Sequence, residues 1–304
     1  MSLDAAAGLL ACPHCHGVLD VGPSSARCPQ GHAFDVARQG YLNLLGGPQP
    51  QNADTAAMLD ARSRVLSGLY GDVIALVARA VAAVGAGVVV DAGAGTGQYL
   101  AAVLDAIPTA VGIATDVSVA AAKRAANAHP RLASLAADTW KGLPITDGAA
   151  DVVLCVFAPR NPADFFRVLA PGGHLVVVTP EPEHLRSLRA AYGLLDLDPD
   201  KDTRLEQSLT GLFALVSSDR LTWSVEATAE QVADVIAMGP NAFHGTPVTG
   251  PERLEIDVRC RTYRRLEHGA NGDGDLPQRE AGKHESRADV DPASPGVVEL
   301  RPGR

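Results

Sequence analysis

Three cysteines and a histidine near the start of the chain have the spacing of a metal site. Cys12, Cys15, Cys28 and His32 form the pattern C-x2-C-x12-C-x3-H. Two thiolates at the separation of the first pair can face one ion, because the turn between them folds back on itself. Thiolate and imidazole are the ligands that tetrahedral zinc prefers in structural sites. The pattern therefore predicts a structural zinc ion held by these four residues.

Two other interpretations of this region stay open in the sequence. His14 and His16 are rival fourth ligands, although both lie too near the first cysteine pair to close a loop. A redox Cys-x-x-Cys pair would need a strand–helix context, which this region lacks. About 35 residues cannot build a core alone, so we expect metal binding to fold them. Cys155 and Cys260 lie in apolar runs and are predicted to be buried, inert thiols.

A second group of residues has the composition of a nucleotide-binding loop. An apolar run over residues 88–90 ends in an acid, and three glycines follow at alternate positions before a helix begins. Glycines allow a tight turn and a close approach of the backbone to a ligand. The spacing D-x-G-x-G-x-G differs from the G-x-G-x-x-G of nicotinamide and flavin sites, and no Lys-Ser/Thr pair follows it. The predicted ligand-binding residues here are Asp91, Gly93, Gly95, Gly97, Tyr99 and Leu100.

This loop resembles the S-adenosylmethionine loop of the class I methyltransferases. One strand–helix unit later, the apolar run 111–116 ends in Asp116. A carboxylate at this place can accept hydrogen bonds from both ribose hydroxyls of a cofactor. The alternative is that Asp116 only caps the helix that begins near Ser118. The resemblance also implies that Asp138, just after the run 132–136, meets the adenine amino group.

The alternation of apolar runs and helical patterns predicts an α/β protein. We expect a class I methyltransferase fold, which is a Rossmann-like doubly wound sheet, with a small N-terminal zinc-binding domain. The last apolar runs, 212–216 and 221–226, are interpreted as two strands. The expected division is a zinc-binding module at 1–36, a linker and connecting helix at 37–70, an S-adenosylmethionine-dependent methyltransferase domain at 71–267 and a disordered tail at 268–304.

Composition and charge limit the function of the protein. The chain has 304 residues and a net charge of −9, which argues against indiscriminate binding to nucleic acid. We find no apolar run of about 18 residues and no signal sequence, so we expect a cytoplasmic protein with no membrane partner. The run 254–266 carries a cluster of positive charge, interpreted as a phosphate track or as the solvated face of an edge strand. Its members are Arg253, Arg259, Arg261, Arg264 and Arg265.

Four motifs together resemble one family. The zinc pattern, "FDVARQGYLNLL" at 34–45, "MLDARSRVLSGLY" at 58–70 and "DAGAGTGQYL" at 91–100 occur in this order. The chain is similar in this respect to the large-subunit rRNA guanine-N1 methyltransferases, a group that includes enzymes conferring resistance to macrolides such as tylosin. The resemblance covers the chain from about Cys12 to about Arg265.

The resemblance implies a reaction and a set of site residues. The reaction is S-adenosylmethionine-dependent methylation of guanine N1 in hairpin 35 of 23S rRNA, and the bias toward Ala, Gly, Val and Arg favours nucleotide 748 over 745. Tyr70 and His184 would contact the cofactor, and the zinc module would bind the hairpin. The target-base pocket would be lined by Phe157, Pro159, Arg160 and Asn161. The group that removes the N1 proton is not identified, and a homodimer stays open.

Two other functions compete with this one. A small-molecule class I methyltransferase would share the glycine loop, but it would leave the zinc module and the arginine cluster without a role. An RNA-binding zinc protein with a non-catalytic methyltransferase fold would not need an intact loop together with Asp116. Binding of S-adenosylmethionine separates the last alternative from the other two.

Overall fold

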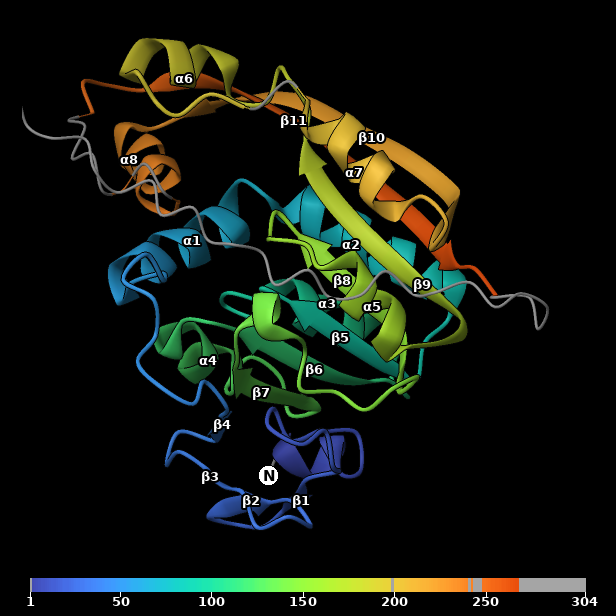
Figure 1. The fold of residues 1–304 in the computed structure, drawn as a ribbon. Helices are drawn as coiled ribbons and strands as arrows, with labels where there is room; N and C mark the ends of the chain where they lie inside the picture. Colours follow the sequence, from blue (N-terminus) through green and yellow to red (C-terminus); the bar gives the residue numbers. More distant parts are fainter. Residues whose placement is uncertain (1, 198–199, 240–241, 243–247, 268–304) are drawn as a thin grey trace, which may run out of the picture. The chain divides into compact units, whose positions relative to one another are not determined.

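The computed structural model describes residues 2–197, 200–239, 242 and 248–267, so the tail predicted at 268–304 lies outside the described residues. An eight-stranded sheet forms the centre of the described chain, in the order β10-β11-β9-β8-β5-β6-β7-β4 (Figure 1). Its strands are β4 (Tyr41–Asn43), β5 (Val88–Ala92), β6 (Val111–Asp116), β7 (Leu132–Ala136), β8 (Ala150–Val156), β9 (Leu169–Pro180), β10 (Phe213–Ala227) and β11 (Glu252–Arg265).

The directions of the strands confirm the predicted class I methyltransferase fold. From β4 to β9 all neighbouring strands are parallel, whereas β11 is antiparallel to both β9 and β10. From β5 the chain continues to β6 and β7 on one side of the sheet. It then returns to β8 on the other side of β5, so the strand order reverses between β5 and β8. Ligands of doubly wound sheets bind at such a switch point, beyond the carboxyl ends of the strands. The glycine loop follows β5 and therefore lies there.

Helices and the N-terminal segment cover the two faces of the sheet. Successive strand residues alternate between the faces: Val89 packs with helices α1, α2 and α3, while Val90 packs with α5, α7 and the N-terminal segment. The helices are α1 (Ala56–Gly68), α2 (Gly71–Val84), α3 (Gln98–Ala106), α4 (Val119–Ala125), α5 (Pro162–Val168), α6 (Arg186–Tyr192), α7 (Lys201–Leu209) and α8 (Ala229–Ala237), and one 3-10 turn, η2 (Thr139–Lys141), follows β7.

The N-terminal segment forms a small module that packs on the large sheet. It contains the 3-10 helix η1 (Ser2–Ala6) and an antiparallel sheet of β1 (Asp20–Val21), β2 (Ser25–Arg27) and β3 (Ala33–Asp35). Leu10 bridges to Ile145, and β4 extends the large sheet beside β7. The small N-terminal domain is thus present, and its apolar residues share a core with the sheet.

The expectation of two separate strands over these C-terminal runs is wrong. The runs 212–216 and 221–226 belong to one strand, β10, because the polar residues between them pair with β11 in unbroken antiparallel register after a bulge near Leu215. Their polarity marks a solvent-exposed edge strand and not a turn.

No single helix in the described part of the chain is long and apolar enough to cross a bilayer. Helices α1 and α2 pass that test only as a pair, and they are bent by 79°.

Candidate active site and metal centre

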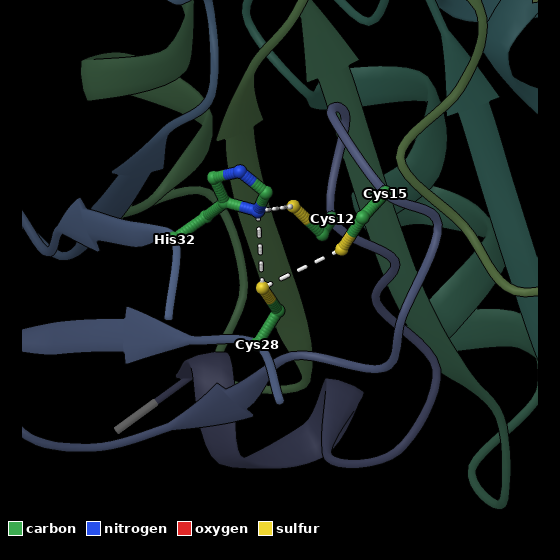
Figure 2. A group of neighbouring side chains, drawn as sticks. All are labelled: Cys12, Cys15, Cys28 and His32. Atoms are coloured by element: carbon green, nitrogen blue, oxygen red, sulfur yellow. Dashed lines mark hydrogen bonds between the residues drawn. The ribbon is translucent and has the colours of Figure 1, made fainter. Parts of the chain in front are cut away.

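The four predicted zinc ligands converge on one point. Their ligand atoms all lie within 4.8 Å of one another (Figure 2). His32 Nδ1 lies 3.3 Å from Cys28 Sγ and 3.6 Å from Cys12 Sγ, and the sulfurs of Cys15 and Cys28 are 3.5 Å apart. Zinc–sulfur bonds of about 2.3 Å place tetrahedral ligands roughly 3.8 Å from each other. The residues therefore fit a structural zinc ion, as predicted.

The backbone holds these ligands in two turns. Cys12 N–H donates to the carbonyl of Gly17 at 2.8 Å, and Cys28 N–H donates to the carbonyl of His32 at 3.1 Å. The rival ligand His14 instead stacks on Phe34, with ring centroids 5.8 Å apart. Burial opposes ionisation of the Cys28 thiol, but hydrogen bonds with Cys15 and His32 lower its pKa to about 6. A thiol with this pKa is largely ionised at neutral pH, which is the form that binds zinc.

The glycine loop follows β5 in the conformation that its sequence requires. Gly93, Gly95 and Gly97 have φ angles of +82°, +54° and +77°. A Cβ atom on Gly93 would lie 2.6 Å from the Cβ of Ala158, and one on Gly95 would lie 3.0 Å from a guanidinium nitrogen of Arg62. Glycine is therefore needed here both for the backbone conformation and for the space it leaves.

Asp116 is held beside this loop. One carboxylate oxygen accepts from Gly95 N–H and the other from Ser118 N–H, both at 2.8 Å. Ser118, and not Asp116, is the residue whose side chain caps α4, because its Oγ accepts from Ala121 N–H. Burial raises the pKa of Asp116 against the lowering effect of these two hydrogen bonds. These two hydrogen bonds therefore hold the carboxylate of Asp116 beside the glycine loop.

Two buried groups behind the loop have no hydrogen-bond partner in the described part of the chain. They are the carboxylate of Asp91, with both oxygens unpaired there although the residue is only 1% exposed, and the hydroxyl of Tyr99. Burial, and then the charge of Asp116, raise the pKa of Asp91 to about 7. An unpaired buried carboxylate favours a cationic ligand, and S-adenosylmethionine carries an ammonium and a sulfonium. Leu100, the last residue predicted in this loop, is fully buried in the core below it.

Tyr70 and His184 meet inside the protein, although 114 positions separate them. Tyr70 Oη lies 3.0 Å from His184 Nε2, and His184 Nδ1 accepts from Asp257 N–H at 3.2 Å. The acceptor role of Nδ1 places the imidazole proton on Nε2, which then donates to the tyrosine oxygen. Burial lowers the pKa of His184 to about 4 and raises that of Tyr70. Both residues are therefore neutral at physiological pH.

Phe157 lies at the carboxyl end of β8 in an unusual conformation. Its φ is +53°, which is rare for a bulky residue, and its side chain is 39% exposed. Its ring stacks near that of His184 and meets Tyr70 edge-on, with centroids 6.3 Å and 6.4 Å away. Such strain is concentrated at functional sites. The structure thus joins one predicted pocket residue to two predicted cofactor contacts.

The rest of the predicted pocket follows Phe157. Pro159 is exposed, Arg160 is partly exposed, and Asn161 caps α5 through its side chain. The Asn161 amide also donates to the Thr139 carbonyl at 3.2 Å, so the loops after β7 and β8 touch.

Asp138 caps the turn η2 in the loop after β7. Its carboxylate accepts from Trp140 N–H at 3.0 Å, and the Trp140 side chain is 69% exposed. Sequence analysis did not single out Trp140, although a tryptophan in a loop after a parallel strand is a signal for a binding surface.

The arginine cluster on β11 is not a phosphate track. Arg259 is paired with Glu181 at 2.6 Å, and Arg261, only 7% exposed, with Asp202 at 2.7 Å. Arg265 donates to the Leu169 carbonyl and lies over the Phe166 ring. Only Arg253 and Arg264 of the five are exposed. The continuous track expected from the sequence is thus absent, because acidic residues from other elements neutralise Arg259 and Arg261 and Arg265 is engaged with Leu169 and Phe166.

Arg62 of α1 is a further residue at the glycine loop that the sequence analysis did not single out. Its side chain is partly buried, reaches the loop and pairs with Asp54 at 2.5 Å.

Comparisons with known proteins agree with this geometry. The family described as "RlmA, N-terminal" matches residues 10–49, and the one described as "Methyltransferase domain" matches residues 89–173. A relative from Micromonospora griseorubida, assigned by name to the 23S rRNA (guanine-N(1)-)-methyltransferases, is 46% identical over 82% of this chain and 90% of its own length. The 23S rRNA (guanine(748)-N(1))-methyltransferase of Streptomyces fradiae is 46% identical over 78% of this chain and 87% of its own length.

Among solved structures, a chain from the complex of the Haloferax volcanii Trm112 methyltransferase activator with a methyltransferase has a TM-score of 0.47 and 16% identity, covering 70% of this chain and 97% of that one. Each of the two relatives is 46% identical to this protein over an aligned region that covers most of both chains. The chain is therefore an S-adenosylmethionine-dependent enzyme with a structural zinc site, and it belongs to the 23S rRNA (guanine-N1)-methyltransferase family.

Proposed function

We propose that the protein methylates N1 of a guanine in hairpin 35 of 23S rRNA, at nucleotide 748. The observation that carries this proposal is the 46% identity to the Streptomyces fradiae enzyme, whose name specifies guanine 748, over 87% of that enzyme. Residues 10–49 of this chain also match the family described as "RlmA, N-terminal", and a small-molecule methyltransferase would not need such a zinc module. Nucleotide 745 is the competing position within the same hairpin.

The donor site is proposed from the residues around the glycine loop. S-adenosylmethionine supplies an electrophilic methyl group, whose transfer depends mainly on proximity and orientation. Asp116 would accept hydrogen bonds from the ribose hydroxyls, because its carboxylate already faces backbone N–H groups at the loop. Asp91 would face the positive charge of the donor, because no group within the described residues pairs with its carboxylate. Asp138, which follows β7 and caps η2, would meet the adenine amino group.

The remaining predicted donor contacts support the methionine side of the site. Gly93 and Gly97 would let the backbone approach the donor, and Tyr99, whose hydroxyl has no partner, would give it a hydrogen bond. Tyr70 and His184 form the wall next to Phe157. Since both are neutral, they would orient the methyl group and the incoming base without adding charge.

The target base would enter beside Phe157. A guanine within a hairpin must leave its stack to be methylated, and single bases are bound by stacking on aromatic rings. Phe157 and Trp140 are exposed aromatic side chains in the two loops that Asn161 joins. Pro159 and Arg160 lie in the same loop as Phe157 and complete the proposed pocket. Burial lowers the pKa of His184 and raises that of Tyr70, so we do not propose either residue as the base that removes the N1 proton.

The zinc module would provide a second contact to the hairpin. It packs against the edge of the sheet near β7, the strand whose loop carries Trp140. Binding through specific surfaces is compatible with a net charge of −9, which disfavours general attraction to phosphates. We place this activity in the cytoplasm and include macrolide resistance as its consequence. Whether the protein acts as a homodimer is decided by sedimentation of the free protein.

One assay tests the proposal against its alternatives. A transcript of hairpin 35 is incubated with the protein and labelled S-adenosylmethionine and then copied by primer extension, because N1-methylguanine blocks base pairing. We expect label in the RNA and a stop at nucleotide 748. A transcript with adenine at 748 is the matched control and should remain unlabelled. A stop at 745 would reassign the nucleotide, and RNA binding without transfer would support a non-catalytic protein.

A further inference from the structure

The guanidinium of Arg62 lies over the glycine loop and connects three segments of the chain. Its Nη1 would be 3.0 Å from a Cβ on Gly95, so it lies against the backbone of the loop. The same nitrogen pairs with Asp54 at 2.5 Å, and Nη2 donates to the Met238 carbonyl at 2.7 Å. With 25% of its side chain exposed, Arg62 is neither a solvated surface residue nor sealed in the core.

Some of the polar groups around Arg62 lack a hydrogen-bond partner among the described residues. Asp91 and Tyr99 have buried polar atoms without partners. Burial is the main cause that raises the pKa of Tyr99, and the nearby Tyr70 and Asp91 raise it further. The charge of Arg62 acts in the opposite direction on Tyr99, and it also has a lowering effect on the pKa of Asp116. The guanidinium is thus close enough to act on groups at both ends of the loop. A ligand here meets one unpaired carboxylate and one arginine.

We propose that Arg62 binds the carboxylate of the methionine part of S-adenosylmethionine, and that Asp54 occupies the same guanidinium when the donor is absent. The methionine part carries one carboxylate and one ammonium, which match Arg62 and Asp91 in charge. A guanidinium donates two parallel hydrogen bonds to a carboxylate, and Nη1 of Arg62 already donates to the carboxylate of Asp54.

Asp54 is well placed for this exchange. Its backbone is fixed separately, because the Asp54 carbonyl accepts from Ser118 Oγ at 2.7 Å. Its side chain can therefore leave Arg62 without release of the segment before α1. Donor binding replaces one ion pair by another, and Asp54 competes with the donor. The inference depends on donor use by this site and not on the identity of the methylated RNA.

Calorimetric binding of two donor analogues tests the inference. S-adenosylhomocysteine carries the carboxylate and the ammonium, whereas its decarboxylated form keeps only the ammonium. We expect Arg62→Gln to weaken binding of S-adenosylhomocysteine by about 10- to 100-fold, the usual effect of a lost charged hydrogen bond. Binding of the decarboxylated analogue should change less than about twofold. Asp54→Asn removes the competitor and should tighten only the carboxylate-bearing analogue.

Arg64→Gln is the matched control. Arg64 lies on the same helix but pairs with Asp234 of α8, so neither affinity should change. Equal weakening of both analogues by Arg62→Gln would overturn the inference, and so would an Asp54→Asn protein that binds both as the wild type does. The second variant keeps the test decisive if Arg62→Gln fails to fold. A wild-type protein that bound S-adenosylhomocysteine but did not methylate the hairpin would refute the proposed function and leave this inference intact.

Discussion

Tyr70 Oη and His184 Nε2 lie 3.0 Å apart in the interior, where the histidine proton is donated to the tyrosine oxygen. The tyrosine precedes α2 and the histidine follows β9, so this hydrogen bond connects the start of the catalytic fold to the end of β9. Phe157 packs on both rings. A change in the protonation of His184 therefore affects the proposed base-entry side of the site directly.

The first prediction concerns the pH dependence of stability. Burial lowers the pKa of His184 to about 4, below its value of about 6.5 in the unfolded chain. The unfolded state thus binds more protons, and stability present above pH 6.5 is lost as the pH falls toward 4. We expect the loss from this residue to reach about 3 kcal/mol. Urea unfolding of the wild type and of His184→Gln between pH 4.5 and 7.5 measures it, and parallel curves for the two proteins would contradict the assignment.

The second prediction concerns Asp91. Burial raises its pKa to about 7, so the native state is destabilised as the pH rises from about 4 to above 7. Asp91→Asn removes a buried charge and should stabilise the free protein at pH 8 by a few kcal/mol. The same change should weaken S-adenosylhomocysteine binding at least tenfold. Thermal unfolding with and without this ligand measures both effects, and a stabilised variant with unchanged affinity would exclude Asp91 from the donor site.

The third prediction concerns the metal. The wild type should contain one zinc ion per chain, and Cys28→Ser should lose it, since three ligands bind zinc far more weakly than four. Cys260→Ala is the control, because Cys260 is buried in β11, away from the cluster. Elemental analysis of purified protein gives the stoichiometry. Full zinc content in Cys28→Ser would require a different ligand set.

The fourth prediction concerns Trp140. Trp140→Ala should weaken binding of hairpin 35 RNA by about 5- to 100-fold, the range expected for one stacked base, and Trp140→Phe should restore most of the affinity. S-adenosylhomocysteine affinity should not change in either variant.

Fluorescence gives a direct second readout for Trp140. The chain has only two tryptophans, so Trp223→Phe leaves Trp140 as the single emitter. Its emission should be quenched when RNA is added to protein already saturated with S-adenosylhomocysteine. Unchanged emission upon RNA binding would show that no base stacks on this side chain.

The sequence was sufficient for features that depend on local pattern. The strands that end in Asp116 and Ala136 have the predicted bounds, because continuous apolar runs with polar ends identify buried parallel strands. The ligand spacing likewise identified the metal cluster.

The features that the sequence could not provide depend on contacts between distant segments. The pairs Arg259–Glu181 and Arg62–Met238 join residues 78 and 176 positions apart, and no periodicity reports them. A run of arginines looks the same in sequence whether acids from other elements neutralise it or not. Solvent exposure of Trp140 is equally invisible before the fold is known.

The short strand β4 has a consequence for how the chain folds. It covers the edge of β7, which would otherwise present unpaired backbone groups to other chains. β4 is synthesised long before β7, so it can pair only after residues 132–136 have been made. A chain that lacks residues 1–43 would expose the edge of β7 and would therefore be prone to edge-to-edge aggregation. The N-terminal segment thus protects the sheet from aggregation.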